Sequence, residues 1–222
     1  MLVPVIRHRW DLSPQEAIAL QRELVSRIIQ KDVLPKITTV AGIDVGVKGG
    51  VARAAVVVMR FPELEIIEHV RAELPLAFPY VPGLLSFREA PAILEALAKL
   101  EHDPDVLIFD GQGYAHPRRM GIATHIGILL DHPTVGCAKS RLCGTFEEPG
   151  IERGSYSWLW DGKEIIGAVV RTRTRVKPVF VSVGHKMRLE SAIDLVLQCG
   201  RGYRLPEPTR WAHRLASGDG AR

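Results

Sequence analysis

Hydrophobic residues in the first half of the chain gather in runs that are closed by glycine, proline or charged residues. Three of these runs, at residues 38–47, 52–60 and 64–74, have the apolar and β-branched composition that is typical of strands. A turn is predicted at residues 61–63, and connections this short join antiparallel neighbours. The opening pattern therefore predicts an antiparallel meander.

A helix is predicted ahead of the meander. Ser13 is a suitable N-cap, Pro14 fits the first helical position, and Glu16 completes a capping box. Apolar residues then recur at helical spacing, at Ala17, Leu20, Leu24 and Ile28. We expect this helix to end near Pro35.

Beyond the meander, helical patterns alternate with short apolar runs. Helices are expected at 89–100, 121–130 and 189–200, and strands at 105–110, 134–139 and in a late hairpin of 164–174 with 178–185. A meander followed by alternation predicts an α/β fold in which a mixed β-sheet is flanked by helices on both faces. The hairpin-linked opening argues against a doubly wound Rossmann topology.

A chain of 222 residues with 46% hydrophobic residues can bury a sizeable core, and we expect one domain over 1–222 with a flexible tail over about 214–222. The formal charge of +4 is compatible with a polyanionic partner but does not require one. Cys137, Cys143 and Cys199 form no CxxC pair, which suits core residues in a reducing compartment. Because no signal peptide or membrane span is evident, we expect a cytoplasmic protein without a membrane partner.

Two aspartates interrupt apolar strands. Asp44 stands inside VAGIDVGV and Asp110 closes DVLIFD, where carboxylates are rare unless they are paired or bind a cation. Asp110 could instead cap the turn to Gly111. Gly42 and Gly46 share the strand face of Asp44, so we expect free space around that carboxylate, as a ligand site requires.

A cation would relieve the repulsion between these carboxylates. On neighbouring strands about 6 Å apart they would repel by roughly 3 kcal/mol at an effective dielectric constant near 20. Such repulsion raises one carboxyl pKa by about two units unless a cation intervenes. A hard divalent cation with oxygen ligands, Mg²⁺ by default, satisfies this requirement.

Glu89 is a third candidate ligand with two open interpretations. Ser86 and Glu89 fit a capping box, which would give the carboxylate a structural role. With Ser86 as the cap, however, Pro91 would fall just past the first turn, where its missing N–H carries a cost. A later helix start would free Glu89 to point elsewhere.

Glycines and cations follow Asp110. The third glycine of a dinucleotide-binding motif would fall at His116, and there is no Walker lysine, so neither phosphate-loop motif is present. Gly111 and Gly113 are expected to let the backbone approach a ligand closely. His116, Arg118, Arg119, Lys139 and Arg141 would by themselves form a solvated basic rim.

Two further features favour a nucleic-acid partner. Arg171, Arg173 and Arg175 would line one face of a strand, where like charges repel unless an anion such as a phosphate backbone lies across them. Tyr80, between prolines, is a stiff and exposed aromatic side chain of a shape suited to enter a base stack.

Six segments, in order along nearly the whole chain, closely resemble the endonuclease V family of deoxyinosine-specific 3′ endonucleases. They are PYVPGLLSFREAP (79–91), DGQGYAHPRRMGIATHIG (110–127), PTVGCAKSRL (133–142), KPVFVSVGHK (177–186), LESAIDLVL (189–197) and PEPTRWAHRLA (206–216). The resemblance implies a ribonuclease H-like fold built on a mixed sheet of the five-strand type. This agrees with the pattern of a meander followed by alternation.

The resemblance also implies the site. Asp44, Glu89 and Asp110 would be the catalytic carboxylates that bind Mg²⁺, with Mn²⁺ as a substitute, His213 would stand in the place of a fourth group, and Lys139 would lie near the scissile phosphate. The DNA-contacting residues would be Pro79, Tyr80, Val81, Pro82, His116, Arg118 and Lys139, the first four as a wedge that separates the strands. The hypoxanthine pocket would be formed mainly by the backbone of Gly83, Leu85, Gly111 and Ile122.

The implied reaction is hydrolysis of the second phosphodiester bond 3′ to the lesion, which leaves the base in place and a 3′-hydroxyl and a 5′-phosphate at the nick. Damaged double- or single-stranded DNA, and inosine-containing RNA as a further candidate, would be the partners of a monomer. The chain departs from the family at Gly46 and Val47, where Ser or Thr and an aromatic residue are usual, which puts the packing beside Asp44 in question. Arg188 stands where a serine often caps the last helix, a loss of about 1 kcal/mol.

Two rival functions remain. One is a nucleic-acid-binding module that has lost turnover, but this chain retains all three carboxylates. The other is a metal phosphohydrolase acting on free nucleotides. Such an enzyme would not need the loop of residues 79–82 to separate strands, or the arginines at 171, 173 and 175 to bind a phosphate backbone.

Overall fold

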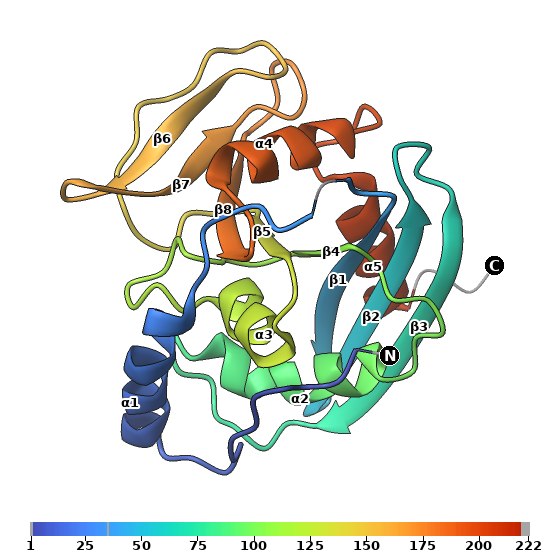
Figure 1. The fold of residues 1–222 in the computed structure, drawn as a ribbon, viewed down its shortest axis with the longest axis vertical. Coiled ribbons are helices and arrows are strands. Elements are labelled where there is room, and N and C mark those ends of the chain that lie inside the picture. Colours follow the sequence, from blue (N-terminus) through green and yellow to red (C-terminus); the bar gives the residue numbers. More distant parts are fainter. Residues whose placement is uncertain (1, 35, 219–222) are drawn as a thin grey trace.

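A mixed eight-stranded sheet runs through the molecule (Figure 1), in a computed structural model that describes residues 2–34 and 36–218. The strand order is β3-β2-β1-β4-β5-β8-β7-β6. The strands are β1 (Thr39–Lys48), β2 (Val51–Arg60), β3 (Ile66–Pro75), β4 (Val106–Phe109), β5 (Thr134–Ala138), β6 (Tyr156–Asp161), β7 (Glu164–Val170) and β8 (Val179–His185). Only the β1–β4 and β4–β5 pairs are parallel, so the predicted meander and mixed sheet are confirmed.

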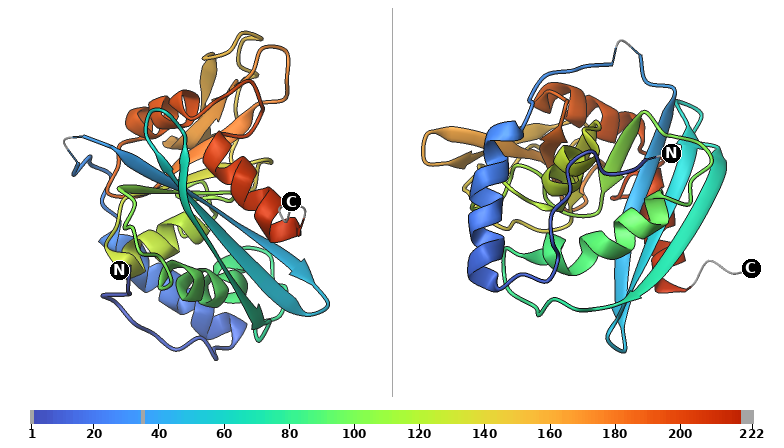
Figure 2. Two further views of the ribbon diagram at one scale, coloured as in Figure 1. Left: turned by 90° about the vertical axis from the view of Figure 1, so that its right-hand side faces the viewer. Right: turned by 60° about the horizontal axis from the view of Figure 1, so that its bottom comes forward.

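Helices cover both faces of the sheet, as predicted (Figure 2). They are α1 (Pro14–Leu24), α2 (Leu85–Leu97), α3 (Ile122–Leu130), α4 (Leu189–Gln198) and α5 (Glu207–Ser217). Helices α2 and α3 pack on the face that carries Ala41 and Ile43 of β1, whereas α4 and α5 pack on the face that carries Val40. This alternation along β1 is what gives the sheet two cores.

Helix α1 has the predicted start but a different end. The reciprocal capping box of Ser13 and Glu16 is present. The helix ends at Leu24, and a 3₁₀ turn at Val25–Arg27 follows, so the expected end near Pro35 is wrong. Position 35 itself lies outside the described residues.

The carboxyl-terminal half differs from the prediction in three places. Strand β6 was missed, so the sheet is larger than the five-strand type that the family resemblance suggested. Helix α5 continues to Ser217, so residues 214–217 are not a tail; residues 219–222 lie outside the described part of the chain. Cys137 and Cys199 are buried as predicted, while Cys143 is half-buried.

The arginine strand is also a wrong prediction, because β7 ends at Val170. Arg171 is buried and its guanidinium is bonded to Glu148 and to three backbone carbonyls, of Pro149, Gly150 and Val176. Arg173 and Arg175 are exposed in the following turns. The three side chains therefore do not form one cationic face.

Helix α4 lacks a side-chain cap at Arg188, as expected, but Asp32 from a distant segment takes that role. Arg188 offers no side-chain cap, but Asp32 accepts hydrogen bonds from the Arg188 backbone N–H at 2.9 Å and from the Ser191 hydroxyl at 2.7 Å. A carboxylate at a helix amino terminus is stabilising. Among the described residues, no helix has the length and apolar composition needed to cross a bilayer.

Candidate metal centre and base pocket

Parallel pairing of two central strands brings Asp44 and Asp110 together. Ile43 of β1 is in register with Phe109 of β4, so the two aspartates are the next residues along neighbouring strands. The Asp110 backbone N–H donates to the Ile43 carbonyl at 2.9 Å, which fixes the strand end. Asp110 therefore lies at the end of the sheet with its carboxylate beside Asp44. This position allows it to bind a cation and not only to cap the turn to Gly111.

His213 joins the two aspartates from helix α5. Its Nδ1 lies 2.7 Å from Asp44 Oδ2, and ligand atoms of Asp44, Asp110 and His213 all lie within 4.8 Å of one another. The space expected beside Asp44 is occupied by α5. A Cβ on Gly42 would stand 1.9 Å from the Pro208 carbonyl carbon, and one on Gly46 would stand 2.9 Å from the Ala216 carbonyl oxygen.

Gly42 and Gly46 thus admit the helix that carries His213. This also accounts for the departure at Gly46, because a side chain there would push α5 away. The glycines serve the site indirectly, by letting α5 approach, and do not provide an empty ligand cavity.

Glu89 is freed from the capping role that the sequence allowed. Helix α2 begins at Leu85 without a side-chain cap, and the Ser86 hydroxyl instead contacts His125 Nδ1 at 2.9 Å. Pro91 is tolerated inside the helix. Burial, together with the charges of Asp44 and Asp110, raises the pKa of Glu89 to about 8. Glu89 lies outside the 4.8 Å group but within electrostatic reach of both aspartates.

The donor set fits a hard divalent cation. Burial and the Asp44 charge raise the pKa of Asp110, against the opposing influence of Lys139. The Lys139 ammonium lies 2.5 Å from Asp110 Oδ2 and supplies a positive charge there. Carboxylates held this close are destabilised in their ionised forms, and a cation with oxygen ligands removes that destabilisation.

A cavity of about 350 Å³ adjoins this group and includes Asp110 in its wall. All four predicted pocket residues, Gly83, Leu85, Gly111 and Ile122, line it, together with His116, Met120, Lys139 and others. A Cβ on Gly111 would stand 2.8 Å from the Ile122 side chain, so glycine keeps the wall thin there. Gly113 instead packs against the Val183 carbonyl, so it does not serve close approach to a ligand.

The loop at 79–82 forms one rim of the cavity. The Tyr80 side chain is 72% exposed, as predicted, and Pro79 and Pro82 are exposed beside it. Val81 is half-buried and packs on the cluster around Phe78, Leu84 and Phe87. Val81 therefore anchors the loop, while Tyr80 projects from it.

Three of the five side chains of the predicted basic rim, His116, Arg118 and Arg119, are engaged in contacts within the protein. His116 is buried, and burial is the main cause that lowers its pKa to about 4. Arg118 donates to the Gly83 carbonyl at 2.8 Å, and Arg119 to Glu164 and Asp161. Only Lys139 and Arg141 of this set are exposed.

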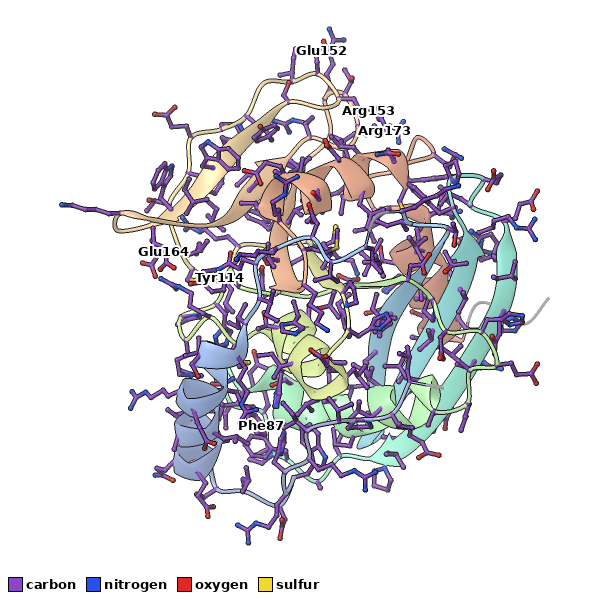
Figure 3. All side chains as sticks on the ribbon, in the orientation of Figure 1. Phe87, Tyr114, Glu152, Arg153, Glu164 and Arg173 are labelled. Carbon is purple, nitrogen blue, oxygen red and sulfur yellow. The ribbon has the colours of Figure 1, made fainter. Side chains whose placement is uncertain are left out.

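The loop after Asp110 is tied to the β6–β7 hairpin. Tyr114 donates to Glu164 at 2.5 Å, and these two side chains lie side by side in Figure 3. Arg119 closes the same contact with Glu164 and Asp161. The cavity wall is thereby held by strands that are distant in sequence.

Gln21 and His125 were missed by the sequence reasoning. Gln21 is fully buried on α1 and contacts two cavity-lining loops, and His125 is fully buried on α3 behind Ser86. One signal was available for Gln21, since it follows Ala17 by four residues and precedes Leu24 by three. A polar residue on a buried helix face needs partners.

Known proteins of one family are similar to this chain over almost its full length. The profile of the family Endonuclease V matches residues 22–214. Endonuclease V of Methanothrix thermoacetophila is 51% identical over 209 residues, which cover 94% of this chain and 93% of that protein. Endonuclease V of Roseiflexus sp. is 54% identical over 208 residues, 94% of each chain.

Solved structures agree as well. The crystal structure of endonuclease V from Streptomyces avermitilis superposes with a TM-score of 0.91 at 41% identity and covers 96% of both chains. Endonuclease V of Ciona intestinalis, in complex with a 23mer DNA containing an inosine followed by a ribo-adenosine, has a TM-score of 0.83 at 29% identity and covers 94% of this chain and 98% of that one. On sequence and structure together, the chain belongs to the endonuclease V family.

Proposed function

We propose that this protein is a Mg²⁺-dependent endonuclease that repairs DNA at deaminated bases, chiefly deoxyinosine. It hydrolyses the second phosphodiester bond 3′ to the lesion and leaves the lesion in place. The observation that carries the proposal is that Asp110 belongs both to the group of two carboxylates and one imidazole and to the wall of the adjoining cavity of about 350 Å³. The inosine-containing DNA bound by the Ciona relative supports the same substrate.

Asp44, Asp110 and Glu89 are the residues that would hold the cation, and His213 orients the Asp44 carboxylate. A bound Mg²⁺ supplies a Lewis acid at a phosphoryl oxygen and a more acidic water. Lys139 balances the Asp110 charge and offers an ammonium for the phosphate.

Hydrolysis at this site is balanced with water alone. The water oxygen forms the new bond to phosphorus, the P–O3′ bond breaks, and O3′ leaves as a hydroxyl. The products are a 3′-hydroxyl and a 5′-phosphate, so the nick can be extended by a polymerase.

Selection of the lesion rests on the cavity and on Tyr80. Extrusion of hypoxanthine from the duplex costs less than extrusion of a normally paired base. Tyr80, stiffened by its proline neighbours, fills the gap that the extruded base leaves. A wall of backbone and of glycines sized for hypoxanthine excludes the 2-amino group of guanine by steric clash.

Three finer points belong to the same proposal. Mn²⁺ replaces Mg²⁺, inosine in single-stranded DNA and in RNA is also bound, and the active species is a monomer. The enzyme acts in the cytoplasm, where thiols such as those of Cys137 and Cys199 stay reduced.

A nicking assay tests the proposal. Duplexes with one deoxyinosine, matched RNA and an adenine-containing control are incubated with Mg²⁺, Mn²⁺ or EDTA. We expect a nick at the second bond 3′ to inosine with either metal, none with EDTA and none in the control. Tight binding without a nick would favour a nucleic-acid-binding module that has lost turnover. Hydrolysis of free nucleotides alone would favour a metal phosphohydrolase.

A further inference from the structure

Gln21 connects three segments behind the cavity. Its Nε2 donates to the Gly83 carbonyl at 3.0 Å and to the Met120 carbonyl at 3.2 Å, and its Oε1 accepts from Arg118 Nε. These partners fix the orientation of the amide, because the donors and acceptors match in one way only. Gln21 is fully buried, so water does not compete for the contacts.

The Gly83 carbonyl is the focus of this network. It accepts from Gln21 Nε2, from Arg118 at 2.8 Å and from His116 Nε2 at 3.0 Å. The tautomer of His116 follows, since its Nδ1 accepts from the Arg118 backbone N–H at 3.1 Å and Nε2 must carry the proton. Three donors on one carbonyl hold the peptide of Gly83 in a single orientation.

Gly83 and Met120 stand on different walls of the cavity. Gly83 continues the loop that carries Tyr80, and Met120 precedes Gly121 and Ile122. Helix α1 packs on the first wall through Ala17, beside Phe78 and Leu84. Gln21 is the residue of α1 that bonds both walls at once.

We propose that Gln21 is a positioning residue that sets the separation of the two cavity walls and thereby the selection of hypoxanthine over bases that carry a group at C2. The inference rests on the proposed function for the identity of the base. Gln21 does not line the cavity, so its role requires no contact with the substrate.

The physical reason is the difference in size between the bases. Hypoxanthine carries hydrogen at C2, whereas guanine carries an amino group and xanthine an oxygen. A pocket rejects an added group only as far as its walls resist displacement. The bonds of the Gln21 amide to both walls add that resistance to the direct bonds that His116 and Arg118 make to the Gly83 carbonyl.

The test compares Gln21→Met with Ser13→Ala. Methionine keeps the length of the side chain and removes every hydrogen bond, whereas Ser13→Ala weakens the cap of α1 and leaves Gln21 intact. Both variants are assayed with Mg²⁺ on duplexes that carry inosine, xanthosine or a G·T mismatch at the same site. Hydrogen exchange of amides 80–85 and 119–122 is measured in the free protein.

For Gln21→Met we expect KM for inosine duplex to rise about tenfold, kcat to change less than about threefold, and selectivity against xanthosine and guanine to fall about tenfold. Exchange should quicken at both walls in Gln21→Met and not in Ser13→Ala. Unchanged selectivity, or the same loss in Ser13→Ala, would overturn the inference. If the wild type fails to nick inosine, the proposed function falls, and the exchange data still decide whether Gln21 joins the walls.

Discussion

Glu89 is the residue on which burial and like charge act together. Sequence reasoning placed the repulsion between Asp44 and Asp110 and expected a rise of about two pKa units on one of them. In the structure burial and the Asp44 charge raise the pKa of Asp110, and burial, with the charges of Asp44 and Asp110, raises the pKa of Glu89 to about 8. The sequence did not indicate that the third carboxylate, Glu89, would also be destabilised in its ionised form.

A pH-dependent loss of stability follows for the metal-free protein. The folded pKa of Glu89, about 8, lies above its ordinary value of 4.5, so its contribution to stability is complete below pH 4.5 and is lost as pH rises through 8. Glu89→Gln should therefore raise the free energy of unfolding in EDTA by about 4 kcal/mol at pH 8 and leave it unchanged near pH 4. Denaturant unfolding at several pH values measures this.

Glu95→Gln is the matched control, because Glu95 is exposed on the same helix. It should leave the pH profile of stability as in the wild type. An identical profile for Glu89→Gln would mean that Glu89 ionises without hindrance, contrary to this account. Addition of Mg²⁺ should reverse the order of stability, since the wild type alone then gains a full ligand set.

At the scale of elements, loops are fixed by side chains from distant segments. The loop at 79–82 is anchored by Val81 and Phe78 and leaves Tyr80 exposed, and helix α4 is capped by Asp32. The exposure of Tyr80 could be predicted from the sequence because Pro79 and Pro82 lie on either side of it. Neither Asp32 nor Gln21 could be assigned a partner, since each contact joins residues that only the folded chain brings together.

Tyr80→Ala should weaken binding to inosine-containing duplex about tenfold and binding to inosine-containing single strands much less. The reason is that only a duplex has a stack to be filled after the base leaves. Tyr156→Ala, an exposed tyrosine on β6, serves as control. Fluorescence anisotropy measures both affinities, and an equal loss on the two substrates would remove the wedge role.

Asp32→Ala should lower the free energy of unfolding by about 1 kcal/mol, because it removes the acceptor for the backbone N–H of Arg188, the N-cap residue of α4, and for the Ser191 hydroxyl. Asp194→Ala, at an exposed position within α4, should cost less. Thermal unfolding of both variants decides the point. If Asp32→Ala is as stable as the wild type, the contact is not a cap in solution.

For the whole molecule, the sequence predicted much of the fold and the core of the site. Central strands such as β4 are continuous apolar runs, and their hydrophobic pattern suffices. Strand β6, at the sheet edge, was missed although its aromatic residues and the Asp161-Gly162 turn to β7 are strand and hairpin signals. Arg171 had the pattern of a surface cation but is buried on backbone carbonyls, which no spacing in the sequence indicates.

The central claim is that Asp110 belongs to a metal centre that cuts DNA beside the base cavity. The most direct measurement is single-turnover nicking by Asp110→Asn on deoxyinosine duplex with Mg²⁺, alongside its affinity for the same duplex. We predict affinity within about threefold of wild type and a nicking rate lower by at least about a thousandfold. Nicking by Asp110→Asn at the wild-type rate would contradict the account.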